Sequence, residues 1–357
     1  MKWVMREQQR RESDFNAGSK ARADCDAILV SEGYEPLIAN LEIDPSQQPL
    51  KKVLLQFTRK TEWKKSIAGV KPGDTVAIQY PVRNHTIFFG SVLKALNKRG
   101  VKTVGIIHDL ESLRKAIDKN IPAVSKLRFS LEEVSALKYF SMIIVHNEHM
   151  KKAIHEMFDV PMEKMVSLHI FDYLYEGSSE GKAVQEGPVI IAGSLDKNKA
   201  GYVYHLPENV PVELFGANLD ENFTFTENIT YKGKVPPDEL PSLLKGSFGI
   251  VWDGPAAETC EGVFGEYLKV NNPHKASLYL ASGLPLIVWS QSALADYVKK
   301  HGCGICVDSL GEIAAAVQAL SAEQYAEIVK NVAAFGALVR SGHYLKKAFR
   351  TAEARMQ

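Results

Sequence analysis

Residues 75–109, TVAIQYPVRNHTIFFGSVLKALNKRGVKTVGIIHD, read as a strand, a helix and a second strand. The two predicted strands, 75–80 and 103–107, are mainly apolar, and the apolar residues between them recur at helical spacing up to Gly100, a helix-stop signal. Apolar strands joined by helices are typical of a parallel sheet that is covered on both faces. The stretch therefore predicts an α/β fold whose functional side chains follow the carboxyl ends of the strands.

The same alternation continues on both sides of this stretch. Towards the N-terminus, an amphipathic helix is predicted up to Gly33, and the apolar run 53–57 is predicted as a strand. Towards the C-terminus, helices are predicted at 275–282 and 294–301, and a helical tail at 322–356 with a bend at 335–336. The further predicted strands are 141–145, 189–192, 212–215, 229–231, 248–252, 286–289 and 305–307.

A linker composition at 172–187 divides the chain of 357 residues into two halves. Two domains suit this length better than a single core does. We expect two Rossmann-like α/β domains that face a cleft, spanning 1–172 and 173–330. A C-terminal helix, 331–357, is expected to pack back towards the first domain.

The overall composition excludes several classes of protein. Lys and Arg number 43 against 42 Asp and Glu, a net charge of +1, which argues against bulk nucleic-acid binding. The chain has no apolar stretch of about 18 residues that could span a membrane, and its polar N-terminus lacks the apolar middle of a secretory signal. With four cysteines only, a cytoplasmic location is expected, and Cys303 and Cys306 are interpreted as structural residues.

Residues 253–308 carry the strongest chemical signal, which is anion binding. The run 273–275, Pro-His-Lys, and the run 291–293, Gln-Ser-Ala, each precede or open a predicted helix. Free amides and a fractional positive charge gather at such helix starts, and Ser292 could cap its helix or bind a phosphate oxygen. We expect a diphosphate site there. The alternative is that His274 and Lys275 lie on a solvent-exposed helix start.

Three motifs resemble one bacterial glycosyltransferase family. They are IHDLESLR at 107–114, NNPHK at 271–275 and YLASGLP at 279–285, and residues 16–20 and 79–81 fit the same pattern. The family contains the third-step glucosyltransferases of serine-rich-repeat adhesin glycosylation and the β-1,6-galactofuranosyltransferases of surface polysaccharides. The resemblance implies the two-Rossmann-domain GT-B fold, a nucleotide-sugar donor in the second domain, an acceptor in the first and no metal.

The residues can be assigned roles in transfer from a nucleoside diphosphate. The leaving diphosphate must be stabilised by cations, hydroxyls and helix ends. Lys275 and Lys269 are predicted for this role, the first as a catalytic residue, with Tyr231 beside the base and Asp253 beside sugar or ribose. The full predicted donor set is Ser194, Lys199, Tyr231, Asp253, Gly254, Lys269, Asn271, His274, Lys275, Ser292 and Ala293.

The acceptor must lose a proton if the transfer inverts configuration. Asp109 follows a predicted strand and is the first candidate for the general base; His108 is the other. Asp109 could instead cap the helix that follows it. The predicted acceptor-binding residues are Gly18, Ser19, Lys20 and Tyr80, although the run at 16–20 could also only cap its own helix.

The predicted function is the transfer of a hexose, glucose or galactofuranose, from a UDP-sugar to a glycan, glycoprotein or lipid-linked acceptor without a metal. A non-catalytic nucleotide-sugar-binding or transferase-like subunit is the alternative. A dehydrogenase is disfavoured, because no Gly-x-Gly-x-x-Gly lies between a strand and a helix. Homo-oligomerisation and peripheral contact with the inner face of a membrane are compatible with this prediction; nucleic acid is not an expected partner.

Overall fold

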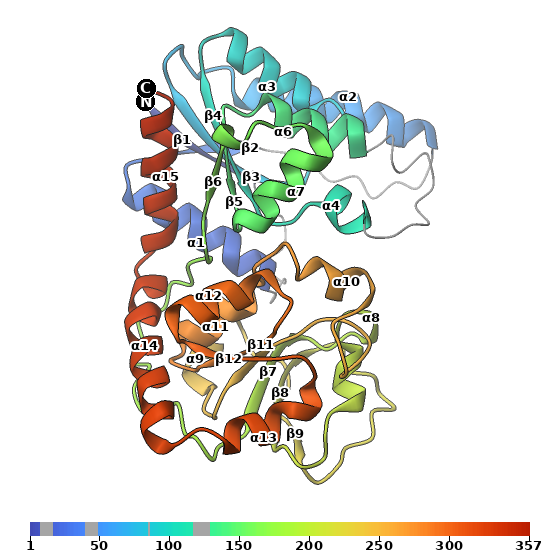
Figure 1. Ribbon diagram of the computed structural model, residues 1–357. Coiled ribbons are helices and arrows are strands. Elements are labelled where there is room, and N and C mark those ends of the chain that lie inside the picture. Colours follow the sequence, from blue (N-terminus) through green and yellow to red (C-terminus); the bar gives the residue numbers. More distant parts are fainter. Residues whose placement is uncertain (8–16, 40–48, 85, 117–128) are drawn as a thin grey trace. The chain divides into compact units, whose positions relative to one another are not determined.

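The computed structural model describes residues 1–7, 17–39, 49–84, 86–116 and 129–357 (Figure 1). The chain forms two compact units. The first comprises Met1–Ser13, Cys25–Leu168 and Leu345–Gln357, and the second comprises Asp14–Asp24 and His169–Tyr344. The main change of unit, at 168–169, lies just before the linker composition noted in the sequence. The assignment of residues 14–24 to the second unit was not indicated by any sequence signal.

The first unit contains a six-stranded parallel sheet in the order β2-β1-β3-β4-β5-β6. The strands β3, β4 and β5 confirm predictions from the sequence. The order reverses between β1 and β3, and ligands of open α/β sheets bind at such a switch point. The strands are β1 Lys2–Glu7, β2 Glu35–Ala39, β3 Thr75–Tyr80, β4 Lys102–Ile107, β5 Met142–Val145 and β6 Met165–Ser167.

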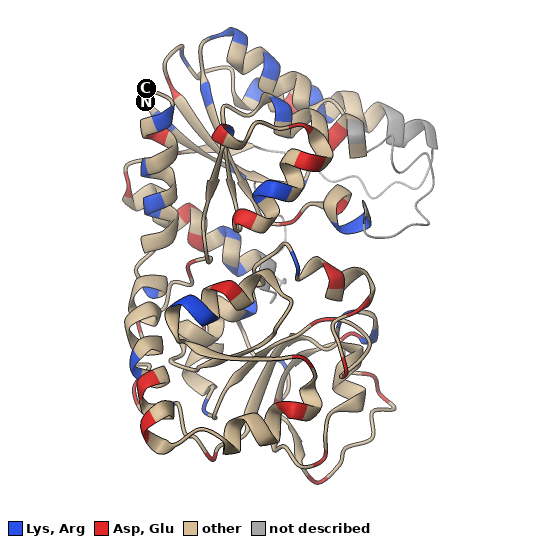
Figure 2. Cartoon of the chain, viewed as in Figure 1, with Lys and Arg blue, Asp and Glu red and all other residues tan. Residues whose placement is uncertain are grey.

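Helices accompany the strands of this sheet (Figure 1). Acidic and basic residues both occur along α7 and α15 (Figure 2), in line with the balanced composition. The helices are α1 Ala17–Ser31, α2 Pro49–Ser66, α3 Phe89–Lys98, α4 Glu111–Ala116, the π-helix η1 Ser130–Val134, α6 Ser135–Tyr139, α7 Glu148–Phe158, the 3-10 helix η2 Met162–Lys164 and α15 His343–Arg355.

The predicted strand at 53–57 is wrong, because this run lies within α2. Leu54 and Phe57 are exposed on that helix, whereas a strand inside a parallel sheet would bury them. The place next to β3 is taken instead by β1, which pairs with both β2 and β3. The sequence of β1, KWVMRE, mixes charged with apolar residues and buries only Val4 and Met5, so it gives a weak strand signal.

The second unit contains another six-stranded parallel sheet, in the order β12-β11-β10-β7-β8-β9. All six strands confirm predictions. The chain enters at the centre with β7, and the order reverses between β7 and β10, which is this sheet's switch point. The strands are β7 Val189–Ser194, β8 Val212–Ala217, β9 Ile229–Tyr231, β10 Gly249–Val251, β11 Leu286–Trp289 and β12 Gly304–Val307.

The core of the second unit lies between this sheet and its helices. Phe248, Ile250 and Trp252, around β10, and Leu214 from β8 are fully buried in it. The helical elements are α8 Lys197–Ala200, η3 Gly201–His205, α9 Leu240–Leu243, α10 Gly262–Tyr267, α11 His274–Ala281, α12 Ala293–His301, η4 Leu310–Glu312, α13 Ile313–Gln318 and α14 Ala322–Arg340.

The tail does not bend at 335–336 as predicted, because α14 runs through both residues. A Cβ atom on Gly336 would lie 2.4 Å from the Leu280 carbonyl oxygen, so this glycine allows α14 to pack closely on α11. The chain leaves the helix at 341–342, where Gly342 has a φ of +75°.

The predicted C-terminal helix 331–357 is divided between two helices: residues 331–340 belong to α14 in the second unit, and α15 packs within the first unit from Leu345 onwards. The Tyr34 hydroxyl donates to Glu353 Oε1 at 2.6 Å, and the Tyr34 ring contacts Phe349 edge-on. Lys2 forms an ion pair with Glu353 at 2.7 Å. Across the described ranges, the helices are all too short or too polar to cross a membrane.

Candidate functional site

The start of α11 holds Lys275 against the end of β10. The Lys275 ammonium donates to the Trp252 carbonyl oxygen and to Asp253 Oδ1, both at 2.8 Å, and its side chain is 14% exposed. Since Trp252 and Asp253 directly follow β10, the cation lies at the switch point of the second sheet. The alternative of a solvent-exposed position for Lys275 is therefore wrong.

Glycines at the ends of β7 and β8 leave backbone exposed near this switch point. Gly193 has a φ of +136° and open space where a Cβ would lie. A Cβ on Gly216, whose φ is +156°, would lie only 1.8 Å from the Gly193 carbonyl oxygen. The two strand ends can therefore approach each other, and a ligand can approach the backbone of Gly193, only because neither residue has a side chain.

Gly254 joins the end of β10 to the turn after β7. Its amide donates to the Lys199 carbonyl oxygen at 2.8 Å, and its φ is +118°. A Cβ there would lie 2.6 Å from the Glu261 carbonyl oxygen, so the position requires glycine. The predicted donor residues Lys199, Asp253 and Gly254 are thus brought together by backbone contacts.

Two more predicted donor residues border these glycines. The Ser194 hydroxyl accepts from the Asn218 amide nitrogen at 3.3 Å, and both residues are exposed or partly exposed at the strand ends. Tyr231 ends β9, and its hydroxyl donates to the Gly216 carbonyl oxygen at 2.8 Å. Ser194 and Tyr231 therefore lie on the same carboxyl edge of the sheet as Gly216.

The predicted phosphate contacts at the start of α12 are already occupied. The Ser292 hydroxyl donates to the Trp289 carbonyl oxygen at 2.7 Å and makes no cap for its helix, so the capping prediction is wrong. The Ala293 amide donates to the Leu268 carbonyl oxygen at 2.9 Å. Both residues are buried, and each donor is already taken by a carbonyl oxygen of the protein, that of Trp289 at the end of β11 or that of Leu268 after α10.

Lys269 differs from Lys275 in its surroundings. Its ammonium pairs with Glu266 at 2.7 Å and lies over the Trp289 ring at 5.3 Å, with the side chain more than a third exposed. An exposed pair of this kind contributes little to stability and holds its cation only weakly. Lys269 can therefore reorient towards a ligand, whereas two short hydrogen bonds hold Lys275 in place.

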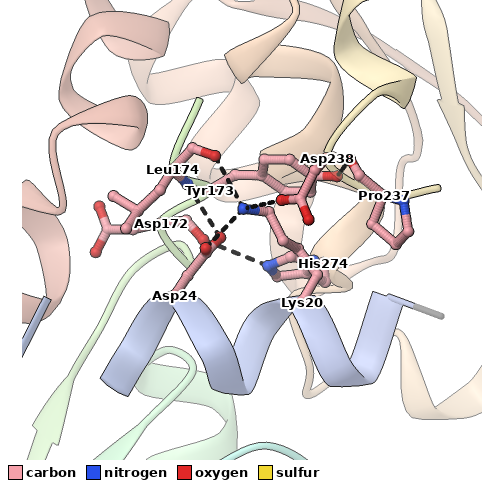
Figure 3. Close-up of polar contacts among 8 residues, drawn as sticks. All are labelled: Lys20, Asp24, Asp172, Tyr173, Leu174, Pro237, Asp238 and His274. Carbon is pink, nitrogen blue, oxygen red and sulfur yellow. Dashed lines mark hydrogen bonds and ion pairs between the residues drawn. The ribbon is translucent and has the colours of Figure 1, made fainter. Parts of the chain in front are cut away.

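Lys20, which was predicted to bind acceptor, lies in a buried ion-pair cluster of the second unit (Figure 3). Its ammonium contacts Asp24 Oδ1 at 2.7 Å, Asp238 Oδ1 at 2.8 Å and the Leu174 carbonyl oxygen at 3.0 Å. An ammonium has three N–H donors, and these three oxygens use all of them. At 8% exposure, Lys20 ties α1 to two segments that are distant in sequence.

The Lys20 cluster continues through Asp24 and Tyr173. Asp24 Oδ2 accepts the Leu174 amide at 3.0 Å, and burial raises the pKa of Asp24 although the Lys20 ammonium opposes this shift. The Tyr173 ring lies beneath the Lys20 ammonium at 5.1 Å, and its hydroxyl donates to the Pro237 carbonyl oxygen at 2.5 Å. Only the Lys20–Asp24 pair, four residues apart on α1, is local, because their partners Tyr173, Leu174 and Asp238 lie about 150 residues or more further along the chain.

His274 begins α11 and contacts the same cluster (Figure 3). Its ring stacks on Tyr173 with centroids 5.1 Å apart, and Nε2 lies 3.3 Å from the Asp172 carbonyl oxygen. Burial lowers the pKa of His274 to about 4, so the ring is neutral near pH 7. Within the described part of the chain, neither the buried Nδ1 of His274 nor the buried Oδ1 of Asn271 has a hydrogen-bond partner.

In the first unit, both candidate bases follow β4. Asp109 is 51% exposed and pairs with Arg114 at 3.0 Å. The carboxylate of Glu133, and not a residue adjacent in sequence, accepts the Glu111 and Ser112 amides at the start of α4. His108 Nε2 lies 2.7 Å from Gln79 Oε1, a contact that the sequence motifs did not indicate.

The other predicted acceptor residues lie in different surroundings. Tyr80 is 1% exposed, stacks on Phe89 and donates its hydroxyl to the Glu132 carbonyl oxygen, so its side chain belongs to the core and does not reach an acceptor. Gly18 and Ser19 lie in the first turns of α1, and Ser19 is partly buried. Asn16, which was noted with them, lies outside the described residues.

Cysteines and metal ligands add no further site. Cys303 is buried with its thiol unpaired, and burial raises its pKa to about 12, which fits the predicted structural role. In the parts of the chain that the structure describes, no three His, Cys, Asp or Glu side chains are grouped so that they could hold a metal ion.

Two parallel sheets, each with a polar carboxyl edge at its switch point, are the architecture of the GT-B fold. Solved structures share this fold. The sucrose-phosphate synthase of Thermosynechococcus elongatus superposes with a TM-score of 0.62 at 13% identity over 99% of each chain. WaaG, a glycosyltransferase involved in lipopolysaccharide biosynthesis, gives a TM-score of 0.60 at 11% identity over 98% of each chain.

The chain belongs to the glucosyltransferase 3-like family, and it is a glycosyltransferase. The N-terminal domain of the family matches residues 1–170, and the C-terminal domain matches residues 189–352. The β-1,6-galactofuranosyltransferase WbbI of Escherichia coli (strain K12) is 29% identical over 93% of this chain and 92% of its own. Glucosyltransferase 3 of Streptococcus gordonii is 30% identical over 79% of each chain. The family predicted from the motifs is confirmed.

Proposed function

We propose that the protein transfers glucose or galactofuranose from a UDP-sugar to a glycan, a glycoprotein or a lipid-linked acceptor. The observation that carries this proposal is the position of Lys275 at the start of α11, held against the end of β10 at a switch point. The two sugars are the ones named in the relatives, a galactofuranosyltransferase and a glucosyltransferase. The similarity to these proteins over most of their length supports a nucleotide-sugar donor.

Lys275 stabilises the departing diphosphate in this proposal. Two of its three N–H donors contact Trp252 and Asp253, and the third has no partner in the described part of the chain. The first amides of α11 lie beside this ammonium and favour a negative charge. The unused N–H of Lys275 and the start of α11 are therefore both available to the diphosphate, on which negative charge develops as its bond to the sugar breaks.

The remaining contacts to the nucleotide-sugar are proposed at the carboxyl edge of the second sheet. The open backbone at Gly193 suits a phosphate, because an amide there can approach without a side chain in the way. Asp253 is held by Lys275 and can accept a hydroxyl of the sugar or of the ribose. Tyr231 and the turn after it, at the end of β9, are proposed to lie beside the base.

We also propose that the transfer needs no divalent metal. In metal-free transfer the diphosphate charge must be met by cations and helix starts, and Lys275 with α11 provides both. The acceptor proton would pass to His108 or Asp109, which follow β4 in the first unit. A homo-oligomer and peripheral contact with a membrane are compatible with this function.

Release of UDP from UDP-glucose and from UDP-galactofuranose by the purified protein tests the proposal. Each donor is incubated with a mixture of glycan acceptors, with and without EDTA. We expect UDP release from one of the two donors, to the same extent in EDTA. Binding of UDP without any release would indicate the non-catalytic subunit instead, and loss of turnover in EDTA would contradict the metal-free route.

A further inference from the structure

Three side chains of the first unit, those of Asp26, Gln79 and His108, are linked by hydrogen bonds. Gln79 Nε2 donates to Asp26 Oδ1 at 2.7 Å, and Gln79 Oε1 lies 2.7 Å from His108 Nε2. Asp26 lies on α1, Gln79 is the penultimate residue of β3, and His108 directly follows β4. Because Tyr80 pairs with Ile107, β3 and β4 end together, next to the switch point between β1 and β3.

The chemistry of Asp26 fixes the orientation of the Gln79 amide. The second carboxylate oxygen of Asp26 lies 3.5 Å from the Arg6 guanidinium, so this aspartate is ion-paired and can only accept hydrogen bonds. The Gln79 group that faces it must therefore be the NH2. The carbonyl oxygen of the same amide then faces the His108 ring, and Gln79 is too deeply buried to turn over freely.

The orientation of Gln79 in turn fixes the proton on His108. A carbonyl oxygen has no proton to donate, so the 2.7 Å contact requires a proton on Nε2 of the ring. In the neutral ring, Nδ1 is then the nitrogen that carries the basic lone pair. This is the arrangement that a general base needs when a second group orients the ring from behind.

We propose that Asp26 and Gln79 are positioning residues that hold His108 with its proton on Nε2, so that Nδ1 accepts the proton of the acceptor hydroxyl. This inference rests on the proposed transfer and selects His108 over Asp109, whose carboxylate is paired with Arg114. The acceptor oxygen forms a bond to the anomeric carbon while the bond from that carbon to the diphosphate breaks. The bonding pair leaves with the nucleoside diphosphate, and the hydroxyl proton moves to Nδ1, with inversion of configuration.

The tautomer can be measured without any turnover. Long-range 1H–15N correlation spectra of the protein labelled with 15N-histidine distinguish a ring protonated on Nε2 from one protonated on Nδ1, and His108→Gln identifies the signals of His108. We expect the Nε2-protonated form in the wild type, and mixed tautomers in Gln79→Met, which can neither donate nor accept a hydrogen bond. An Nδ1-protonated ring in the wild type would overturn the proposal.

The catalytic role is measured from the pH dependence of kcat. In Gln79→Met we expect kcat to fall about tenfold, with the donor KM within about twofold. The acidic limb of the profile should move down by about 0.7 pH unit, because the imidazolium loses one hydrogen-bond acceptor. Asp26→Asn, which keeps an acceptor for the Gln79 NH2, should retain more activity than Asp26→Leu.

The matched control is Gln185→Met. The Gln185 amide also donates one hydrogen bond, to the Leu320 carbonyl oxygen in the second unit, and kcat and its pH profile should stay unchanged there. A wild-type kcat and profile in Gln79→Met, or full activity in His108→Gln, would overturn the proposed role. If the wild type itself transfers no sugar, the proposed function fails, and the spectra still decide the tautomer independently.

Discussion

Lys20 at the start of α1 and Lys275 at the start of α11 show how two similar lysines differ in what they can do. Both are largely buried, and each pairs with a buried aspartate. Lys20 contacts three oxygens and uses every N–H donor, whereas Lys275 contacts two. A lysine whose donors are all used within the protein fixes the fold, and a lysine with one donor left can bind a ligand.

Replacing Lys275 is the strongest test of this difference. We expect Lys275→Met to lower turnover about 100-fold, because the diphosphate loses its cation in the transition state. The measurement is UDP release per folded molecule. Lys330→Met serves as a control, since Lys330 is an exposed lysine paired with Glu327 on α14. Wild-type turnover in Lys275→Met would show that its remaining donor has no role in transfer.

Replacing Lys20 should affect stability instead. In Lys20→Met, Asp24 is left buried without a cation, and we expect the free energy of unfolding to fall by about 3 kcal/mol. Denaturant unfolding measures this loss, and UDP affinity measured calorimetrically should change little. If Lys20→Met lost UDP binding at wild-type stability, Lys20 would be a ligand contact and the distinction between the two lysines would fail.

His274 contacts the Lys20 cluster and is the residue before Lys275. Its titration tests whether the His274 ring is buried between them. Its pKa is about 4 in the folded protein and about 6.5 when unfolded, so the unfolded state binds the proton first as the pH falls. The neutral His274 ring therefore causes no loss of stability above pH 6.5. Between pH 6.5 and 4 the free energy of unfolding falls by about 3 kcal/mol, because only the unfolded state takes up the proton. His274→Gln should show a flatter dependence of unfolding free energy on pH. Equal slopes in both proteins would contradict the burial of the ring.

The smallest effect is expected at Asp238. This carboxylate is 80% exposed, so its pairing with Lys20 is screened by solvent, and Asp238→Asn should lower the free energy of unfolding by less than about 1 kcal/mol. Glu327→Gln, which breaks another exposed pair, gives the reference value in the same denaturant experiment. A loss as large as that in Lys20→Met would mean that Asp238, and not Asp24, dominates the Lys20 cluster.

Local pattern predicted much of the fold. The strands β7–β12 are short, mainly apolar runs between turns, and this composition predicts strands that are buried on both faces of a sheet. By contrast, β1 has charged residues at both ends and buries only Val4 and Met5, and Leu54 and Phe57 of the apolar run in α2 are exposed on that helix. At such positions the secondary structure depends on which strands and helices pack next to the segment. Those neighbours are distant in the sequence, so the local residue pattern does not reveal them.

The candidate site was predictable where a suitable residue type coincides with a helix start, as at Lys275, or with a strand end, as at Asp253 and Gly254. The hydroxyl of Ser292 satisfies the usual pattern of a cap, yet it donates to Trp289, because a nearby carbonyl oxygen competes for it. The partners of Lys20 and of His108 come from remote parts of the chain, Asp238 in one case and Gln79 in the other. Such pairings follow from the tertiary structure, which spacing in the sequence does not report.

The placement of residues 14–24 in the second unit has a practical consequence for dissecting the protein. A fragment cut at the linker, 173–344, would lack Lys20, whose ammonium lies over the Tyr173 ring, and Asp24, whose carboxylate accepts the Leu174 amide. Expression of the C-terminal half by itself should therefore give an aggregation-prone product, and adding a synthetic peptide that spans 14–31 should restore its solubility.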